Sequence, residues 1–166
     1  MISFDSTLSI SKATPAQYKD FSCGMPDLDT YLKRYAKNNE KKGIGKTFVL
    51  LNGQTVIGYY TLSAAQISIT DIPKTYNAKL PAYPVPASRL CRLAVDKSYQ
   101  GQRIGEHLLV DATERVRLAA MNIAIHAIVV DAKNETAKNF YIKYGFMPLD
   151  NSELSLFIPL SIMEEI

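Results

Sequence analysis

The feature that most constrains this chain is an apolar strand that leads through a short loop of glutamine and glycine into a long amphipathic helix. The strand is expected to end at Val95, the loop covers residues 100–105, and the helix is expected over residues 104–120. The first amides of a helix have no partner within the helix and lie at its positive end. With Gly101 and Gly105 free of side-chain bulk, such a loop can bind a phosphate or diphosphate. An ordinary strand-to-helix turn is the alternative, because neither a P-loop lysine nor a Rossmann glycine fingerprint is present.

The composition favours one compact domain. The chain has 166 residues, of which 47% are hydrophobic, and a net charge of +3 that permits an anionic partner without requiring one. Cys23 and Cys91 are expected to be small buried hydrophobes in a reducing compartment. No segment approaches the ~20 apolar residues of a membrane span. Residues 1–10 lack the basic and apolar regions of a secretion signal, so we expect a cytoplasmic protein.

Turn residues and hydrophobic periodicity predict the elements of the first half. A helix is expected to begin at Pro26 and to stop at Gly43. Its buried face is expected to carry Leu28, Tyr31, Leu32 and Tyr35. The pair Asn52-Gly53 predicts a hairpin between residues 47–51 and 55–62. The proline-rich stretch 70–86 is expected to be a loop, and residues 89–95 a strand.

The second half predicts a parallel crossover. The helix over residues 104–120 is followed by the apolar run 123–130, which is typical of a strand buried on both faces. Asn134 is expected to cap a helix that runs to about Tyr144. The last strands are expected over residues 146–149 and 153–160. This order predicts a mixed α/β domain with a central sheet, whose ligands gather at the carboxyl ends of the strands.

Two segments together resemble the GNAT family of N-acetyltransferases, which use acetyl-coenzyme A. The family's phosphate loop, Gln/Arg-x-x-Gly-x-Gly/Ala, is matched by Gln100, Gly101, Gln102, Arg103, Ile104 and Gly105. A later family segment is matched by Asn134, Ala137, Phe140, Tyr141, Gly145 and Phe146. Arg103 stands where the family usually has glycine, and an arginine there need not keep the family's backbone angles. Its amide can still face a diphosphate, and its guanidinium can add a charged contact.

The resemblance implies a fold and a set of site residues. The fold is α/β (mixed α+β): a GNAT-like single domain over residues 1–166, with a central, mostly antiparallel twisted sheet and helices on both faces. Backbone groups of Leu93, Ala94 and Val95 would contact the pantetheine arm, amides of residues 102–105 would hold the diphosphate, and Asn134 would help to orient the arm. Tyr141 occupies the position of a tyrosine that protonates the departing thiolate, and a phenol with a pKa near 10 suits that role. The alternative for Tyr141 is a core aromatic beside Phe140 and Phe146.

The strand before the loop carries no carboxylate. A lysine ammonium, with a pKa near 10.4, needs a base before it can attack a thioester, whereas an α-amine with a pKa near 8 is substantially neutral at pH 7. The absence of an acid over residues 88–95 therefore favours an α-amine as the acceptor. A base from elsewhere in the fold would remove this preference.

Basic residues cluster in two places. Six of them fall within residues 33–46, where Glu40 is the one acid, and three arginines flank the proposed loop. The residues considered for an RNA backbone are Lys33, Arg34, Lys37, Arg89 and Arg92. A solvated helix face is the alternative interpretation. His107 and His126 are expected to be structural, and no cluster has metal-ligand spacing.

A wider resemblance covers nearly the whole chain. Residues 21–32, 43–49, 58–63 and 83–87 are similar to the GNAT toxins of bacterial toxin–antitoxin pairs. Such toxins acetylate the α-amine of aminoacyl-tRNA, which blocks translation. The resemblance implies a cytoplasmic bacterial protein held in check by a ribbon-helix-helix antitoxin, and toxin subunits that commonly form a homodimer.

Two other functions stay open. One is an acetyltransferase for a small-molecule amine or a protein N-terminus, which would share the donor site and would not need the basic surface. The other is a non-enzymatic nucleotide- or RNA-binding module that keeps only the phosphate loop.

Overall fold

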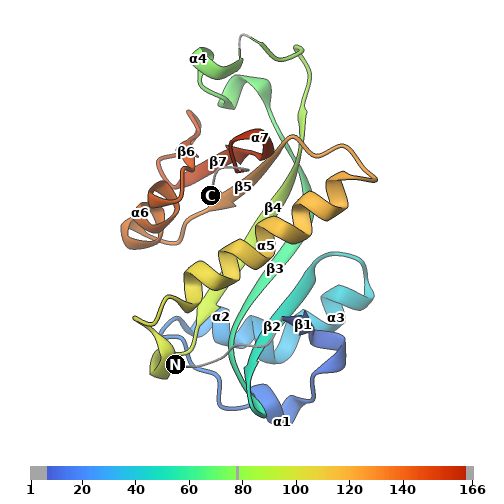
Figure 1. The fold of residues 1–166 in the computed structure, drawn as a ribbon, viewed down its shortest axis with the longest axis vertical. Helices are drawn as coiled ribbons and strands as arrows, with labels where there is room; N and C mark the ends of the chain where they lie inside the picture. Colours follow the sequence, from blue (N-terminus) through green and yellow to red (C-terminus); the bar gives the residue numbers. More distant parts are fainter. Residues whose placement is uncertain (1–6, 78, 164–166) are drawn as a thin grey trace. The chain divides into compact units, whose positions relative to one another are not determined.

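The computed structural model describes residues 7–77 and 79–163 and divides into two compact units (Figure 1). The first unit is Met1–Ser63 with Cys91–Ala112, and the second is Ala64–Leu90 with Thr113–Ile166. The chain passes between them within β3 (Thr55–Ile67), β4 (Val85–Val95) and α5 (Ile104–Ala120). The first six residues of the stretch tested for a secretion signal lie outside the described residues. No helix in the described part of the chain is long and apolar enough to cross a membrane.

The strands form a seven-stranded sheet in the order β1-β2-β3-β4-β5-β7-β6. In the first unit, β1 (Leu8–Ser9), β2 (Lys46–Asn52) and β3 are antiparallel neighbours. In the second unit, β5 (Ala127–Asp131) pairs with β7 (Ser155–Pro159) and β7 with β6 (Met147–Pro148), again antiparallel. β4 and β5 are parallel, with Ala87 opposite Ala127, as a crossover through α5 requires. The predicted mixed, mostly antiparallel α/β sheet is therefore confirmed.

The remaining elements are short. In the first unit they are η1 (Ile10–Lys12), α1 (Pro15–Tyr18), α2 (Pro26–Thr30), η2 (Tyr31–Tyr35), α3 (Ala36–Lys41) and η4 (Lys97–Tyr99). In the second unit they are η3 (Ile69–Asp71), α4 (Lys74–Asn77), α6 (Glu135–Lys143) and α7 (Leu160–Met163).

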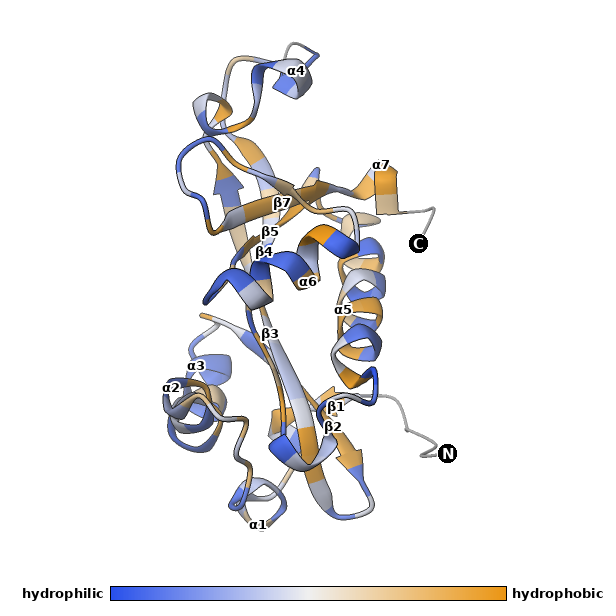
Figure 2. Cartoon of the chain, turned by 90° about the vertical axis from the view of Figure 1, so that its left-hand side faces the viewer, coloured by the Kyte–Doolittle hydropathy of each residue, from blue (hydrophilic) through white to orange (hydrophobic). Residues whose placement is uncertain are grey.

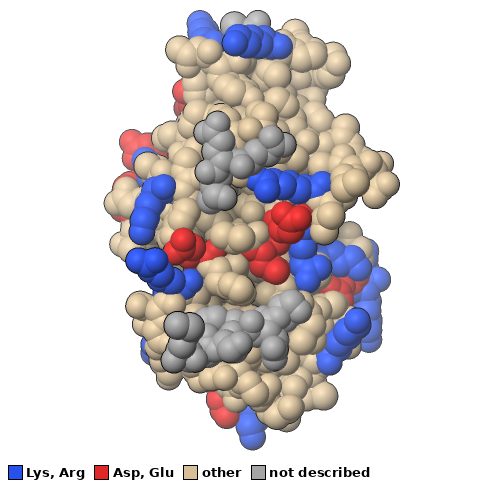
Figure 3. Space-filling model, in the orientation of Figure 1, with Lys and Arg blue, Asp and Glu red and all other residues tan. Residues whose placement is uncertain are grey.

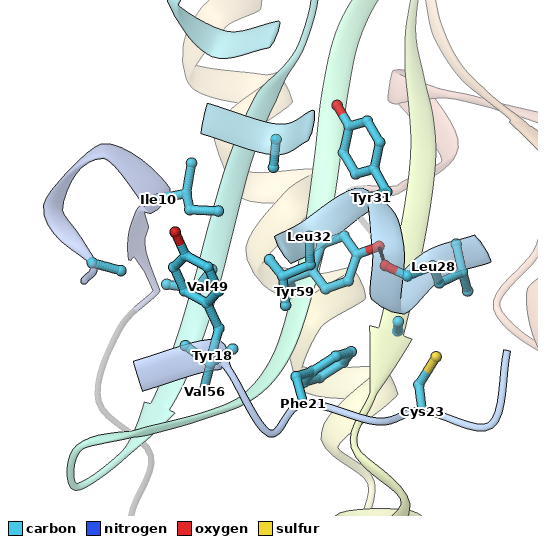
Figure 4. Packing of buried hydrophobic residues seen from close by; sticks show 13 residues of the cluster. Ile10, Tyr18, Phe21, Cys23, Leu28, Tyr31, Leu32, Val49, Val56 and Tyr59 are labelled. Atoms are coloured by element: carbon cyan, nitrogen blue, oxygen red, sulfur yellow. Dashed lines mark hydrogen bonds between the residues drawn. The ribbon is translucent and has the colours of Figure 1, made fainter. Parts of the chain in front are cut away.

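Each unit has its own apolar core. In the first, Phe21, Leu28 and Leu32 pack against Tyr59, whose hydroxyl donates to the Leu28 carbonyl at 2.7 Å (Figure 4). In the second, β5 and β7 are almost continuously apolar (Figure 2), and Phe157 is fully buried in their cluster. The buried Tyr59 hydroxyl thus has a hydrogen-bond partner, which offsets the cost of removing it from water.

A glycine allows close packing beneath α5. A Cβ atom at Gly58 of β3 would lie 2.9 Å from Cδ1 of Leu108 on α5 and 3.2 Å from the carbonyl oxygen of Ala94 on β4. A side chain there would displace the end of the Leu108 side chain and crowd the Ala94 carbonyl. Gly58 therefore allows α5 to pack closely on β3.

Several predicted elements need correction. The strand predicted over residues 123–130 begins only at Ala127, and Ile123 is 66% exposed. The predicted loop 70–86 contains η3 and α4, and Leu160 begins α7 rather than ending a strand. An apolar run indicates burial only when the chain there lies against a neighbour, and residues 123–125 lie before the pairing with β4 begins.

Candidate functional site

The loop between β4 and α5 has an unusual backbone. Gly101 has a φ of +82° and Arg103 a φ of +62°, so two residues in three lie in the left-handed region. Glycine adopts this region freely, whereas for arginine it costs roughly 1–2 kcal/mol. Arg103 therefore adopts a backbone conformation that glycine favours, as the family pattern implies.

This path leaves the first amides of α5 available to a ligand. His107 is the residue whose amide donates to the Arg103 carbonyl, at 3.1 Å, so the amides of residues 104–106 precede the first turn of intrahelical bonds. The residues from Gln100 to Arg103 are exposed, whereas Ile104 is buried and Gly105 and Glu106 are half-buried. The positive end of a 17-residue helix therefore lies directly after an exposed loop, an arrangement that can bind an anion such as a diphosphate.

The Gln100 side chain fixes the loop from within. Its Nε2 atom donates to the carbonyl oxygens of Val95 and Cys23, both at 2.9 Å. The family pattern has glutamine or arginine at this position, and these two hydrogen bonds give a physical reason for that preference. A side chain with several donors can join the end of β4 to the segment before α2.

Asp96 is a positioning residue that the sequence analysis missed. Its carboxylate accepts from the amides of Ser22, at 3.0 Å, and Ser98, at 2.9 Å. The Lys97 amide in turn donates to the Ser22 carbonyl at 2.8 Å. The available signal was local, since an aspartate two residues before Ser98 is a typical N-cap, here of η4. The bond to Ser22 joins distant segments and has no such signal.

Cys23 directly follows Ser22, which these hydrogen bonds hold, and it is buried as expected. Burial raises the pKa of its thiol to about 11, so it remains protonated at neutral pH and is a poor nucleophile. Cys91 is half-buried, with its Sγ 3.2 Å from the Ser63 hydroxyl. His126 has a structural contact, with Nε2 2.9 Å from the Tyr76 hydroxyl.

Asn134 and Tyr141 lie on α6, in the second unit. The Asn134 side chain caps the helix by accepting from the Ala137 amide at 2.9 Å. Tyr141 is buried, with edge-on ring contacts to Phe140 at 5.2 Å and Phe146 at 5.3 Å between centroids. Burial raises the pKa of the Tyr141 hydroxyl, so the phenol stays protonated across the physiological range. The ring is thus both a packing residue and a group able to donate a proton.

The five predicted cations differ in their surroundings. Lys33 and Arg34 are exposed on η2, and blue side chains gather over α3 next to it in Figure 3. Lys37 donates to the Ala13 carbonyl at 2.5 Å and lies over the Tyr18 ring, which are contacts within the first unit.

Both arginines of β4 are held by neighbours. The Arg89 guanidinium pairs with the Asp131 carboxylate on β5, and this carboxylate also accepts from the Ser155 hydroxyl at 2.7 Å. The guanidinium carbon of Arg92 lies 3.5 Å from the centroid of the Tyr31 ring. Such contacts restrict the rotamers of both side chains. In the described residues, no group of three or more His, Cys, Asp or Glu could hold a metal ion.

Known proteins share this sequence and fold. Residues 30–164 match the acetyltransferase (GNAT) domain. The tRNA-acetylating toxin of Mycobacterium tuberculosis is 38% identical over 143 residues, which cover 86% of this chain and 82% of that protein. The structure of AtaT complexed with acetyl-methionyl-tRNAfMet has a TM-score of 0.88 and 30% identity, covering 96% of this chain and 97% of that one.

A second AtaT structure carries other partners. It is a tyrosine-to-phenylalanine variant bound to the C-terminus of the antitoxin AtaR and to acetyl-CoA. It has a TM-score of 0.80 and 29% identity, and covers 98% of this chain and 96% of that one. Because the family match spans most of the chain, this protein belongs to the GNAT family of acetyltransferases.

Proposed function

We propose that this protein is a toxin that transfers acetyl from acetyl-CoA to the α-amine of aminoacyl-tRNA and thereby blocks translation. The relative from M. tuberculosis is named for tRNA acetylation, and AtaT has been captured with an acetylated aminoacyl-tRNA. The single observation that carries the proposal is the glycine-like backbone at Gly101 and Arg103, which opens the start of α5 to a diphosphate.

The donor-binding residues are proposed from the end of β4 onward. Amides of residues 102–105 hold the diphosphate, and backbone groups of Leu93, Ala94 and Val95 contact the pantetheine arm in the manner of a neighbouring strand. These three residues are the last of β4, so the arm would follow directly from the loop. Asn134, at the start of α6, is proposed to orient the arm.

Tyr141 is proposed as the general acid. The neutral amine attacks the thioester carbonyl, a C–N bond forms, the C–S bond breaks, and the departing thiolate takes the phenol proton. The new amide nitrogen loses its surplus proton to solvent, and solvent returns a proton to the Tyr141 oxygen. Because burial raises the pKa of Tyr141, the phenol keeps its proton near neutral pH, where a substantial share of an α-amine is already neutral. No covalent enzyme intermediate is needed.

The acceptor is proposed to be an α-amine on RNA. β4 carries no acid, so an amine that is already neutral near pH 7 suits this site better than a lysine side chain. Lys33 and Arg34 supply exposed positive charge for the RNA backbone, while Arg89 and Arg92 are cations held in place on β4. Lys37 already binds within the first unit, so we assign it a smaller share of RNA binding.

We also propose a protein partner. AtaT binds the C-terminus of its antitoxin AtaR. By analogy, this chain would be neutralised by an antitoxin, for which we propose a ribbon-helix-helix DNA-binding part, and toxin subunits would form a homodimer. Co-expression followed by size-exclusion chromatography with light scattering would measure both assemblies.

The proposal is tested by following a labelled acetyl group. Purified protein is incubated with labelled acetyl-CoA and a mixture of charged tRNAs, with uncharged tRNA, free amino acids and a peptide as controls. Label on charged tRNA alone supports the proposal. Label on the peptide or on a free amine would favour the other acetyltransferase function, and failure to bind acetyl-CoA at high micromolar concentration would favour the binding module.

A further inference from the structure

One aromatic ring of the first unit is turned away from the core by an irregular helix turn. In η2 the Ala36 amide donates to the carbonyl of Tyr31, five residues earlier, as in a π-helix. Because the turn is wider, the residue one turn after Tyr31 on the buried face is Ala36, five positions later and fully buried. Tyr35, predicted for the buried face, is instead 52% exposed. Regular helical spacing was the wrong assumption here, and π-turns are frequent at functional sites.

The same turn is anchored firmly on its inner side. Tyr31 is buried, with the Arg92 guanidinium stacked on its ring. The Tyr31 hydroxyl accepts from Nδ2 of Asn39 on α3 at 3.4 Å. Tyr35 is therefore presented to solvent from a segment whose other ring is fixed by packing and by a cation–π contact.

The surroundings of Tyr35 are basic. Lys33 and Arg34 are exposed in the same turn, and Lys41, Lys42 and Lys46 are exposed beyond it. Between Asp29 and Glu40 the sequence carries no acid. An exposed ring among cations is the combination that binds single-stranded nucleic acid, in which phosphates meet the cations and a base stacks on the ring.

We propose that Tyr35 stacks on an unpaired base of the 3′ end of the tRNA substrate, a role that rests on the proposed function. The 3′ end carries the amino acid and is single-stranded, so its bases are free to stack on a protein ring. Lys33 and Arg34 contact the neighbouring phosphates. Tyr35 is thus a positioning residue that helps to hold the charged end, and it takes no part in the chemistry.

The test uses two RNA hairpins that imitate the acceptor stem. One has a natural unpaired 3′ tail, and the other has a tail of abasic nucleotides with the same phosphates. Fluorescence anisotropy measures the Kd of the wild-type protein and of the variants Tyr35→Phe and Tyr35→Ala for each. We expect Tyr35→Ala to raise the Kd for the natural tail about tenfold, and Tyr35→Phe to stay within about twofold. Neither variant should change the Kd for the abasic tail.

Salt dependence separates stacking from charge. Tyr35→Ala should leave the slope of log Kd against log salt unchanged, whereas Lys33→Ala should reduce it by about 0.7 for a lost contact to a single strand. In steady-state acetylation of charged tRNA, Tyr35→Ala should raise KM with little change in kcat.

Two results would overturn the inference alone. One is that the wild-type protein acetylates charged tRNA while Tyr35→Ala binds the natural-tail hairpin with the same Kd as the wild-type protein. The other is an equal loss on both hairpins, because a ring that contacts protein or maintains the local fold cannot distinguish a base from its absence. A wild-type protein that leaves all charged tRNA unacetylated would overturn the proposed function, and this inference with it.

Discussion

The two units contribute to the proposed reaction in different ways. The first presents main-chain amides at the start of α5 and exposed cations on η2. The second presents one buried hydroxyl on α6, enclosed by two aromatic rings. In the proposed reaction, binding by the first unit would depend on backbone conformation and surface charge, whereas the contribution of the second unit would depend on a single functional group. Substitutions should therefore separate binding from catalysis.

The largest effect is expected from Tyr141→Phe. This change keeps the ring and its packing and removes the proton donor, so kcat should fall by about 10²–10³. The affinity for acetyl-CoA should stay within about twofold by calorimetry, and the thermal midpoint should be little changed. An unaltered kcat would assign Tyr141 to packing alone and would leave the second unit without a catalytic group.

A change of backbone should have the next largest effect. Gly101→Val places a β-branched residue at a φ of +82°, which that side chain adopts only with strain. The loop should shift and the Kd for acetyl-CoA should rise about tenfold or more. Gln102→Ala is the matched control, because amides bind the diphosphate and a lost side chain should change the Kd little. Equal effects of the two substitutions would contradict binding through the backbone.

Surface charge should matter for RNA and not for the donor. The pair Lys33→Ala and Arg34→Ala should raise the Kd for charged tRNA about fivefold near physiological salt and lower its salt slope by about 1.5. Lys37→Ala serves as the control, since its ammonium already binds the Ala13 carbonyl. A larger loss of RNA binding from Lys37→Ala would reverse the assignment of these cations.

The smallest effect concerns stability. Arg103→Gly removes a strained left-handed arginine, and part of the gain is offset by the greater freedom of glycine in the unfolded chain. The free energy of unfolding should rise by about 0.5–1 kcal/mol in urea titrations. A decrease would show that the Arg103 side chain stabilises the loop through its own contacts.

The sequence predicted local features well and long-range ones poorly. The helix Ile104–Ala120 and the turn at Gly53 were predicted correctly, because periodicity, a β-prone pair of runs and an Asn-Gly turn act over a few residues. The hydrogen bond from the Ser22 amide to the Asp96 carboxylate was not predicted, since it joins residues 74 positions apart. The π-turn that exposes Tyr35 was also missed, because the spacing of its apolar residues is the same as in a regular helix.

The candidate site likewise has some features that the sequence predicts and others that only the structure shows. The loop could be read from glycine spacing and family pattern, and the structure then explained Arg103 through its backbone angle. The differing surroundings of Lys33 and Lys37, four residues apart, could not be read from charge alone. Partners in space decide which of two similar side chains is available to a ligand.

The central claim is that the amides at the start of α5 bind the donor's diphosphate. The most direct measurement is a titration of isotopically labelled protein with acetyl-CoA, followed by amide chemical shifts. We predict that the largest shifts fall on residues 102–105, and that acetyl-pantetheine, which lacks the diphosphate, does not reproduce them. Unmoved amides in this segment under saturating acetyl-CoA would contradict the account.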